Sequence, residues 1–144
     1  MSCLFCAIAA GREPAHRVFG DEVAVAFLDV RPLFPGHVLV VPRAHHATLT
    51  DVPPADVGPL FARVRLLAGA VERGMAAAGT FVAANNRVSQ SVPHLHVHVV
   101  PRNPKDGLRG FFWPRTRYDG DRDAEAAADR VRGALADIPP DEER

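Results

Sequence analysis

The segment HLHVHVV carries three histidines, His94, His96 and His98, with one apolar residue between each pair. In an extended strand alternate side chains share a face, so this spacing puts the three imidazoles on one side and Leu95 and Val97 on the other. A buried imidazole needs a hydrogen-bonding partner, and packing alone does not explain three of them in alternation. The pattern therefore indicates a functional site.

Two kinds of chemistry suit such a row of imidazoles. Metal binding is one, but three alternate histidines span ~13 Å of strand, whereas metal–nitrogen bonds are only ~2 Å long. One ion can hold all three only if the strand bends, so we expect their roles to be divided. Phosphate chemistry is the other, because a neutral imidazole can attack phosphorus while its neighbours donate hydrogen bonds to the oxygens.

A second candidate set begins with the pair Cys3 and Cys6. The pair can be a redox couple, two zinc ligands or two small hydrophobic residues. A redox couple normally opens a helix after a strand, and the start of this chain offers no such context. Zinc needs four nitrogen or sulfur ligands, and His45 and His94 are the candidates for the other two, with His46 as the alternative to His45. A complete Cys₂His₂ set leaves no open coordination position, so this zinc would be structural.

The composition limits the classes of protein to which the chain can belong. Its 144 residues are 47% apolar and 24% charged, and 17 acidic and 17 basic side chains give a net charge of zero. This balance excludes a basic nucleic-acid coat and an acidic disordered tail. The apolar runs are shorter than a membrane span of ~20 residues, and the N-terminal residues lack the pattern of a signal peptide. We therefore expect one domain, residues 1–144, in a cytoplasmic protein that binds neither nucleic acid nor membranes.

Hydrophobic periodicity predicts the elements that must position these side chains. Apolar residues at three- and four-residue steps from Val57 to Met75 predict a long helix that begins at Pro53 and ends at Gly79. Shorter helices are predicted at 3–11 and 121–137, and residues 141–144 are expected to fray. Strands are predicted at 16–19, 23–28, 37–43, 80–84 and 94–101. This order favours an α+β fold, in which an antiparallel five-stranded sheet carries one long helix and a C-terminal helix.

HLHVHVV resembles the His-φ-His-φ-His-φ-φ signature of the histidine triad family of nucleotide hydrolases and transferases. The resemblance extends to AFLDVRPLFPGHVLVVPRAH at 26–45, to QSV before the triad, and to CLFC with GREPAHRVF, which is similar to the bacterial zinc-binding branch. Together these blocks cover residues 3–102 in the family's order. The resemblance implies an antiparallel sheet with a long helix, usually paired with a second copy in a homodimer.

The resemblance also implies a substrate and a mechanism. The substrate would be a purine nucleotide with a leaving group, as in a nucleoside phosphoramidate, a dinucleoside polyphosphate or a nucleotidyl sulfate. His96 would attack the α-phosphorus to form a nucleotidyl-histidine intermediate, which water hydrolyses or an acceptor takes over. The bacterial branch often binds zinc at positions that match Cys3, Cys6, His45 and His94.

The same resemblance assigns roles to polar residues around the triad. Asp29 matches the acid that binds the ribose hydroxyls, although its turn propensity offers a structural interpretation. Ser91 would assist the leaving group, and His98 would donate a hydrogen bond to the phosphate. Further candidates are Gln90, one of Asn85 and Asn86, and Arg102 for the phosphates, and His37 as a partner of the triad. A turn, for the asparagines, and a solvated strand end, for Arg102, are the structural alternatives.

Aromatic and basic residues gather in the segment GLRGFFWPRTRYDG at 107–120. Such side chains can stack on bases and pair with phosphates, so the segment could contact the leaving group. Trp113 with Pro114 resembles a Trp-Pro pair that reaches the active site of the other subunit in some relatives. A packed aromatic loop at the edge of a dimer is the alternative.

Two other functions stay open. One is a zinc-dependent hydrolase whose strand histidines surround an activated water, although the sequence has no carboxylate near the triad. The other is a nucleotide-binding regulatory protein in which hydrolysis is incidental.

Overall fold

The computed structural model describes residues 2–109 and 115–139. Its elements are, in chain order, α1 (Leu4–Ala9), β1 (Arg17–Gly20), β2 (Ala24–Leu28), β3 (Val38–Pro42), η1 (Leu49–Asp51), α2 (Pro54–Gly74), β4 (Gly79–Ala83), β5 (Val97–Arg102) and α3 (Asp121–Asp137). The chain divides after Asp106 into two compact units, and each is described by itself. The single domain expected over residues 1–144 stays a prediction.

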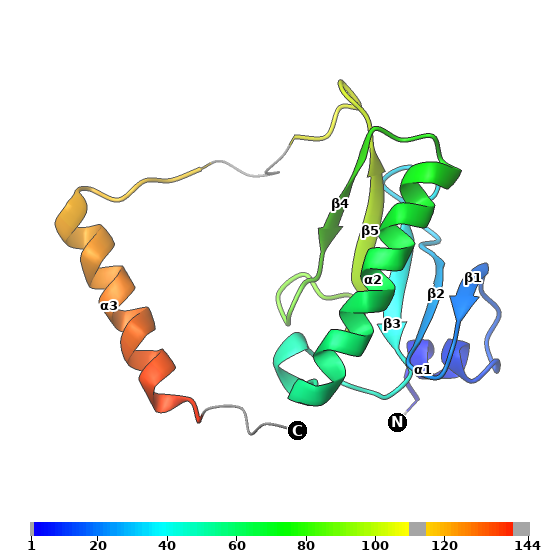
Figure 1. The fold of residues 1–144 in the computed structure, drawn as a ribbon, viewed down its shortest axis with the longest axis horizontal. Coiled ribbons are helices and arrows are strands. Elements are labelled where there is room, and N and C mark those ends of the chain that lie inside the picture. Colours follow the sequence, from blue (N-terminus) through cyan, green and yellow to red (C-terminus); the bar gives the residue numbers. More distant parts are fainter. Residues whose placement is uncertain (1, 110–114, 140–144) are drawn as a thin grey trace. The chain divides into compact units, whose positions relative to one another are not determined.

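The five strands form one antiparallel sheet in the order β1-β2-β3-β5-β4 (Figure 1). The central strand β3 has all five of its residues buried. Strand β5 pairs with it and places His98 opposite Leu39. A strand that is apolar on both faces belongs in the interior of a sheet that is covered on both sides. The predicted α+β class with a five-stranded antiparallel sheet is confirmed.

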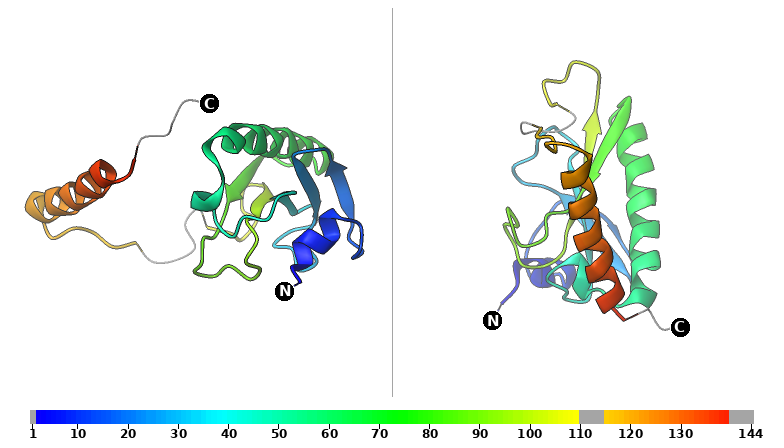
Figure 2. Two further views of the ribbon diagram at one scale, coloured as in Figure 1. Left: turned by 90° about the horizontal axis from the view of Figure 1, so that it is seen from below. Right: turned by 90° about the vertical axis from the view of Figure 1, so that its left-hand side faces the viewer.

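Helix α2 covers one face of the sheet, as the left view of Figure 2 shows. Its buried residues recur at steps of three and four; they are Leu60, Val64, Leu67 and Val71. They share one apolar cluster with Leu95, Val97 and Val99. Each such side chain contributes about 1.5–3 kcal/mol when it is fully buried. The apolar residues between the histidines therefore anchor this segment to α2, and the histidines alternate with them.

Helix α1 lies on the opposite face of the sheet (Figure 2). Phe5 and Ile8 pack there with Phe27, and the two phenylalanine rings meet edge to face with their centroids 5.3 Å apart. The Cys3 thiol caps the helix, because its Sγ accepts a hydrogen bond of 3.4 Å from the backbone N–H of Cys6. A helix of six residues is not stable by itself, so α1 depends on these contacts.

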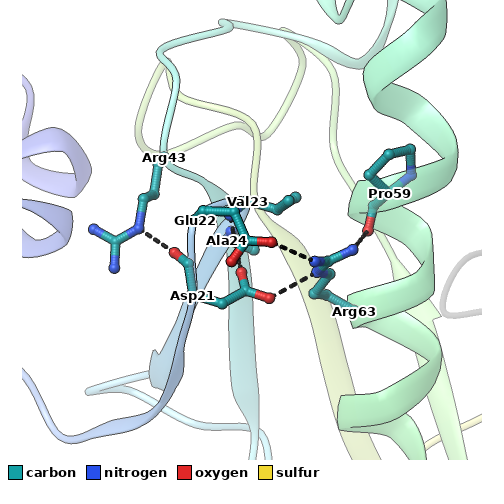
Figure 3. Close-up of polar contacts among 7 residues, drawn as sticks. All are labelled: Asp21, Glu22, Val23, Ala24, Arg43, Pro59 and Arg63. Atoms are coloured by element: carbon teal, nitrogen blue, oxygen red, sulfur yellow. Dashed lines mark hydrogen bonds and ion pairs between the residues drawn. The ribbon is translucent and has the colours of Figure 1, made fainter.

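A polar network joins the β1–β2 turn to helix α2 (Figure 3). The Asp21 carboxylate accepts hydrogen bonds from the N–H groups of Val23 at 2.9 Å and Ala24 at 3.0 Å, and it receives the Arg63 Nε at 2.9 Å. Arg63 also donates to the carbonyl oxygen of Pro59 at 3.1 Å. The bond from Ala24 is the largest influence that lowers the pKa of Asp21. The outer hairpin is thus tied to α2 by charge as well as by packing.

The long helix is shorter than predicted. It ends at Gly74, whereas Gly79 begins strand β4. Ala76 adopts a left-handed backbone conformation with φ of 51°, and the N–H of Ala78 donates to the side chain of Asn103 at 3.1 Å. These two features turn the chain back toward the sheet before Gly79.

Strand β5 also begins later than predicted, at Val97, so only His98 of the three histidines lies within a strand. The backbone N–H of His94 donates to the carbonyl oxygen of Val92 at 2.8 Å, and that of Leu95 donates to His46 at 2.7 Å. The backbone N–H groups of His94 and Leu95 therefore donate to these carbonyl oxygens and not to a neighbouring strand of the sheet. The short helix η1 is not among the predicted elements either.

The second unit contains the predicted C-terminal helix with the same bounds, α3 at Asp121–Asp137. Within it the Arg132 guanidinium pairs with Glu125 at 2.6 Å and with Asp129 at 2.8 Å. Trp113 and residues 141–144 lie outside the described residues, so the predictions about them stay predictions. In the part of the chain that the structure describes, no helix is both long and apolar enough to cross a membrane.

Candidate active site and metal centre

His96 has a defined orientation next to helix α1. It is 3% exposed, and its Nδ1 lies 2.8 Å from the carbonyl oxygen of His94. A carbonyl oxygen only accepts hydrogen bonds, so Nδ1 carries the proton and the lone pair of the neutral ring is on Nε2. The Phe5 ring packs against this imidazole with centroids 5.0 Å apart and an interplanar angle of 84°. In the neutral ring the nitrogen with the lone pair, which a nucleophile requires, is therefore Nε2.

A chain of hydrogen bonds fixes the proton of His98 as well. The backbone N–H of Leu33 donates to Nδ1 of His37 at 3.0 Å, so a neutral His37 carries its proton on Nε2. That Nε2 lies 2.9 Å from Nδ1 of His98 and donates to it. The neutral His98 ring then has its proton on Nε2. His98 can therefore donate a hydrogen bond to an oxygen beside His96, whose ring centroid is 5.1 Å away.

The charge state of these two rings follows from their burial. Burial lowers the pKa of His98 to about 4, and the neighbouring His96 and His37 act in the same direction against Asp29. Burial likewise lowers the pKa of His37, although the Asp29 carboxylate, 3.7 Å from its Nε2, opposes the shift. Both rings are neutral at pH 7, as the chain of hydrogen bonds requires.

A cavity of about 460 Å³ opens beside these histidines. Its polar lining residues are His96, His98, Ser91, Asp29 and Arg31. Most of the other lining residues are apolar, and they include Leu4, Phe5, Ile8, Phe27 and Leu39. The cavity therefore offers apolar contacts as well as polar and charged groups to a ligand. The structure thus brings together four of the predicted site residues around one cavity.

The other predicted phosphate ligands do not line this cavity; they are Asn85, Asn86, Gln90 and Arg102. Asn85 donates to the carbonyl oxygen of Ser89 at 3.2 Å, and Asn86 accepts from the N–H of Leu49 at 2.8 Å. Gln90 holds the same loop through the backbone of Ala47 at 2.6 Å and of Arg87 at 2.8 Å. These three side chains shape the loop that carries Ser91.

Arg102 is engaged at the end of β5. Its guanidinium pairs with Asp106 at 2.6 Å and 3.1 Å, and these hydrogen bonds raise the pKa of Arg102. The pair closes the turn that follows the strand. Arg102 does not line the cavity beside the triad, and its predicted contact with phosphate stays a prediction.

Cys3, Cys6, His45 and His94 converge, with their donor atoms all within 4.8 Å of one another. The Nδ1 of His94 lies 3.4 Å from Sγ of Cys3, 3.5 Å from Sγ of Cys6 and 3.2 Å from Nδ1 of His45, which is itself 3.4 Å from Sγ of Cys6. In a tetrahedral zinc site the sulfur–nitrogen edges are about 3.5 Å and the nitrogen–nitrogen edge is about 3.3 Å. The four side chains fit such a site.

The surroundings of His94 support the same arrangement. Its Nε2 donates to the carbonyl oxygen of Pro42 at 2.8 Å, so the unprotonated Nδ1 is the atom that faces the cluster. His46, the alternative ligand, is not in the cluster, and its side chain lines a separate cavity with Glu22 and Asp56. Burial raises the pKa of the Cys6 thiol, Cys3 adds to the shift, and Arg12 opposes it.

His96 and His98 do not belong to this four-residue cluster. A second group, Asp29 with His37 and His98, also has its donor atoms within 4.8 Å. There, however, the 2.9 Å separation between the two imidazole nitrogens is that of a hydrogen bond. The geometry therefore divides the triad, with His94 in the Cys–His cluster and the other two at the cavity.

Comparison with known proteins gives a consistent result. Residues 10–105 match the family model described as HIT domain. An uncharacterized HIT-like protein of Mycobacterium tuberculosis is 39% identical over 138 residues, which are 94% of each chain. An adenylylsulfatase of Arabidopsis thaliana is 29% identical, with 97% of this chain and 73% of that protein covered. An adenosine 5′-monophosphoramidase of Schizosaccharomyces pombe is 33% identical, with 79% and 84% covered.

Solved structures have the same fold. A Zn-bound histidine triad family protein from Mycobacterium smegmatis is 39% identical, with a TM-score of 0.71, and covers 93% of this chain and 98% of its own. A member of the HIT family from Bacillus subtilis is 30% identical, with a TM-score of 0.83, and covers 92% and 96%.

Proposed function

Because the chain belongs to the HIT domain family, we propose that it is a nucleotide hydrolase or nucleotidyl transferase. It cleaves at the α-phosphate of a nucleoside phosphoramidate or a dinucleoside polyphosphate. The observation that carries this proposal is the pair of fixed tautomers beside one cavity, the lone pair on His96 Nε2 and the N–H on His98 Nε2. Relatives named as an adenylylsulfatase and as an adenosine 5′-monophosphoramidase support the substrate class.

In the first step His96 Nε2 attacks the α-phosphorus. A phosphorus–nitrogen bond forms, and the bond from phosphorus to the leaving atom breaks with its electron pair going to that atom. The His98 N–H donates to a non-bridging oxygen as negative charge develops there. The Ser91 hydroxyl, in the lining of the same cavity, hydrogen-bonds the leaving atom; a leaving nitrogen takes up a proton from water and departs as the amine. Water then attacks phosphorus and gives up a proton to the solvent, and the phosphorus–nitrogen bond breaks with its electron pair returning to Nε2 of His96. An acceptor in place of water gives transfer.

The cavity determines which part of the substrate lies where. The apolar wall that includes Phe5 and Phe27 takes the base, for which we propose a purine. Asp29 accepts hydrogen bonds from both ribose hydroxyls, since a carboxylate can accept two at once. Its position in the lining, beside His98, supports this role.

We also propose a structural zinc ion held by Cys3, Cys6, His45 and His94. The fit of these donors to a tetrahedral site and the Zn-bound relative from Mycobacterium smegmatis support it. With four protein ligands the ion has no open position, so it would supply a cross-link and no step of the reaction. The cross-link joins α1 to the segment that carries His96.

We expect the protein to act as a homodimer in the cytoplasm. Strand β4 is at one edge of the sheet, and Val82 on that strand is 41% exposed. Phe61, Leu66 and Met75 are also exposed, in and just after helix α2. Exposed apolar side chains of this kind commonly belong to interfaces. The molar mass from light scattering after size exclusion tests the dimer, and a monomeric mass at micromolar concentration would contradict it.

The experiment that tests the activity compares substrates with the same nucleotidyl group. Hydrolysis of adenosine phosphoramidate is measured beside that of diadenosine polyphosphates, with the guanosine versions in parallel. We expect turnover of at least one of them, with the nucleoside monophosphate as a product. The covalent adduct is sought by mass spectrometry at neutral or basic pH, because phosphoramidates are acid-labile. No turnover of any substrate by metal-loaded protein would refute the proposal.

A further inference from the structure

Two arginine side chains meet beside Gly20, the last residue of strand β1. A Cβ atom added to Gly20 would lie 2.7 Å from Nη2 of Arg17 and 3.5 Å from Nη2 of Arg43. The two nitrogens are therefore at most about 6 Å apart, which is less than the Debye length of about 8 Å at physiological ionic strength. Two positive charges are thus held close enough to repel each other. None of the three residues lines the cavity beside the triad or belongs to the Cys–His cluster.

A β-bulge in the edge strand β1 directs Arg17 to this point. Arg17 pairs with Phe27 and Gly20 pairs with Val25, so three steps along β1 correspond to two steps along β2. In a regular strand, residues three positions apart point to opposite faces of the sheet. The extra residue puts Arg17 and Gly20 on the same face. Phe27 and Val25 both belong to the apolar cluster with α1, so this is the face that carries α1.

Backbone carbonyl groups hold the guanidinium of Arg43. Its Nη1 donates to the carbonyl oxygen of Ala9 at 2.9 Å, and its Nε donates to the carbonyl oxygen of Asp21. Nη2 is the nitrogen of this group that comes nearest to Gly20. Because both acceptors are neutral, these hydrogen bonds fix the guanidinium and leave its charge uncompensated. Arg43 thus joins the end of α1 to the β1–β2 turn.

The acidic side chains of the β1–β2 turn are engaged with a different arginine. The carboxylates of Asp21 and Glu22 pair with Arg63 at 2.9 Å and 3.4 Å. Figure 3 shows Arg63 and Arg43 on opposite sides of Asp21. In the part of the chain that the structure describes, neither arginine beside Gly20 forms an ion pair with a carboxylate. The two charges therefore have no carboxylate partner there.

We infer that Arg17 and Arg43 form a binding site for a phosphate group. An anion between the two guanidinium groups relieves their repulsion, and each group presents N–H donors in a planar fork that matches phosphate oxygens. Both side chains are exposed, so a ligand reaches them from solvent. Charge-assisted hydrogen bonds from two such groups at a surface support a Kd of about 1 mM. The site uses neither the triad nor a metal, so it does not depend on the proposed function.

NMR titration of the full-length protein tests this inference. Inorganic phosphate replaces chloride at constant ionic strength, and the resonances of the Gly20 N–H and of the Nε–H groups of Arg17 and Arg43 are followed. We expect saturable shifts at these groups. Shifts confined to residues of the cavity beside the triad, or equal shifts with acetate, would overturn the inference.

A second titration distinguishes two sources of the phosphate group. Glycerol 3-phosphate is a small phosphate ester, and it is compared with the inorganic ion at the same resonances. Tighter binding of the ester would assign the site to a phosphorylated small molecule. Tighter binding of the inorganic ion would assign it to free phosphate. Absence of saturable shifts with both ligands would refute the site.

Matched arginine variants separate the site from the effect of net charge. Arg17→Ala should weaken phosphate binding at Gly20 about tenfold, the effect of one hydrogen bond to a charged group. Arg65→Ala removes the same charge from an exposed position on α2 and should keep the wild-type Kd. Equal weakening by the two variants, or no weakening by Arg17→Ala, would overturn the inference.

A third variant moves one guanidinium and keeps the net charge. The methyl group of Gly20→Ala would occupy space that the terminal nitrogen of Arg17 now fills, so this flexible side chain has to turn away. Binding of phosphate should weaken severalfold. Gly58→Ala is the control, because its added methyl group meets no atom within 4 Å, and it should bind as the wild type does. Wild-type affinity in a folded Gly20→Ala protein, checked by its melting curve, would refute the role of Arg17.

Discussion

His96 and His94 are joined by a 2.8 Å hydrogen bond from the Nδ1 of His96 to the carbonyl oxygen of His94. The ring of His94 points into the Cys–His cluster, whereas the ring of His96 lines the cavity beside the triad. One residue thus contributes its side chain to the cluster and its backbone to the orientation of the proposed nucleophile. A change in the backbone conformation of His94 would move its carbonyl oxygen, which is the acceptor that keeps the lone pair of His96 on Nε2.

The first prediction concerns metal at this cluster. Purified protein should carry about one zinc ion per chain, as sites with four protein ligands do. Cys6→Ser should lower both the zinc content and the melting temperature, and it should lower kcat because His94 loses its anchor. His46→Ala is the matched control, since His46 is outside the cluster, and it should keep its zinc. Absence of zinc from protein never exposed to chelator or acid would refute the site.

The second prediction concerns the nucleophile. His96→Ala should abolish turnover and leave nucleotide binding measurable, because the cavity keeps its apolar wall and Asp29. His16→Ala changes an exposed histidine whose side chain is not part of the cavity lining, and it should retain wild-type kcat. Steady-state kinetics and equilibrium binding check the pair. A His96→Ala protein with wild-type kcat would exclude the covalent mechanism.

The third prediction concerns Asp29 and the ribose. Each hydrogen bond to a charged group contributes ~1.5–3 kcal/mol, so a 2′-deoxy substrate should lose about tenfold or more in kcat/KM. Asp29→Ala should remove most of this preference and harm the deoxy substrate much less than the ribo substrate. Measurement of kcat/KM for both substrates with both proteins is the test. Equal losses together with a lower melting temperature would make Asp29 a turn residue, consistent with its acceptance of the Arg31 N–H at 2.9 Å.

The fourth prediction concerns pH and His98. Its pKa is about 4 in the folded protein and near 6.5 when unfolded, so the unfolded chain binds the extra proton. The stability that follows from a neutral His98 is complete above pH 6.5 and is lost as the pH falls toward 4. His37 and His94, whose pKa values are also lowered, act in the same direction.

A difference measurement isolates His98 from the other two histidines. Melting temperatures between pH 7.5 and 4 should fall less steeply for His98→Gln than for the wild type, because the variant has no proton to take up at this position. His16→Gln should follow the wild-type curve. Identical slopes for His98→Gln and the wild type would contradict the lowered pKa of His98.

The parts of the site that the sequence predicted are those marked by side-chain type. The alternation of His94, His96 and His98 is a local pattern, and Cys3 and Cys6 are rare residues whose chemistry suggests a metal. The structure brings the expected set of four donors together. Asp121 and the alanine-rich segment after it were enough to predict the bounds of α3.

The parts that the sequence did not predict depend on backbone groups. The N–H of Leu33, the carbonyl oxygen of Pro42 and that of His94 determine which nitrogen of three histidines carries the proton. Almost every residue has a backbone N–H and a carbonyl oxygen, so the type of residue does not indicate which of these groups will bind a histidine. Phe5 likewise reads as an ordinary core residue, and only tertiary packing brings its ring against His96.

Helix α1 has only six residues, and different residues in and just before it contribute to the Cys–His cluster and to the cavity beside the triad. Cys6, with Cys3 just before the helix, supplies donors to the cluster, while Leu4, Phe5 and Ile8 are part of the wall of the cavity beside the triad. Because different residues line the cavity and supply the donors, substitution of Leu4 and Ile8 leaves all four donors of the cluster in the sequence. In terms of the proposed function, changes at these two positions would alter the preference for the base while the proposed zinc cross-link stays the same.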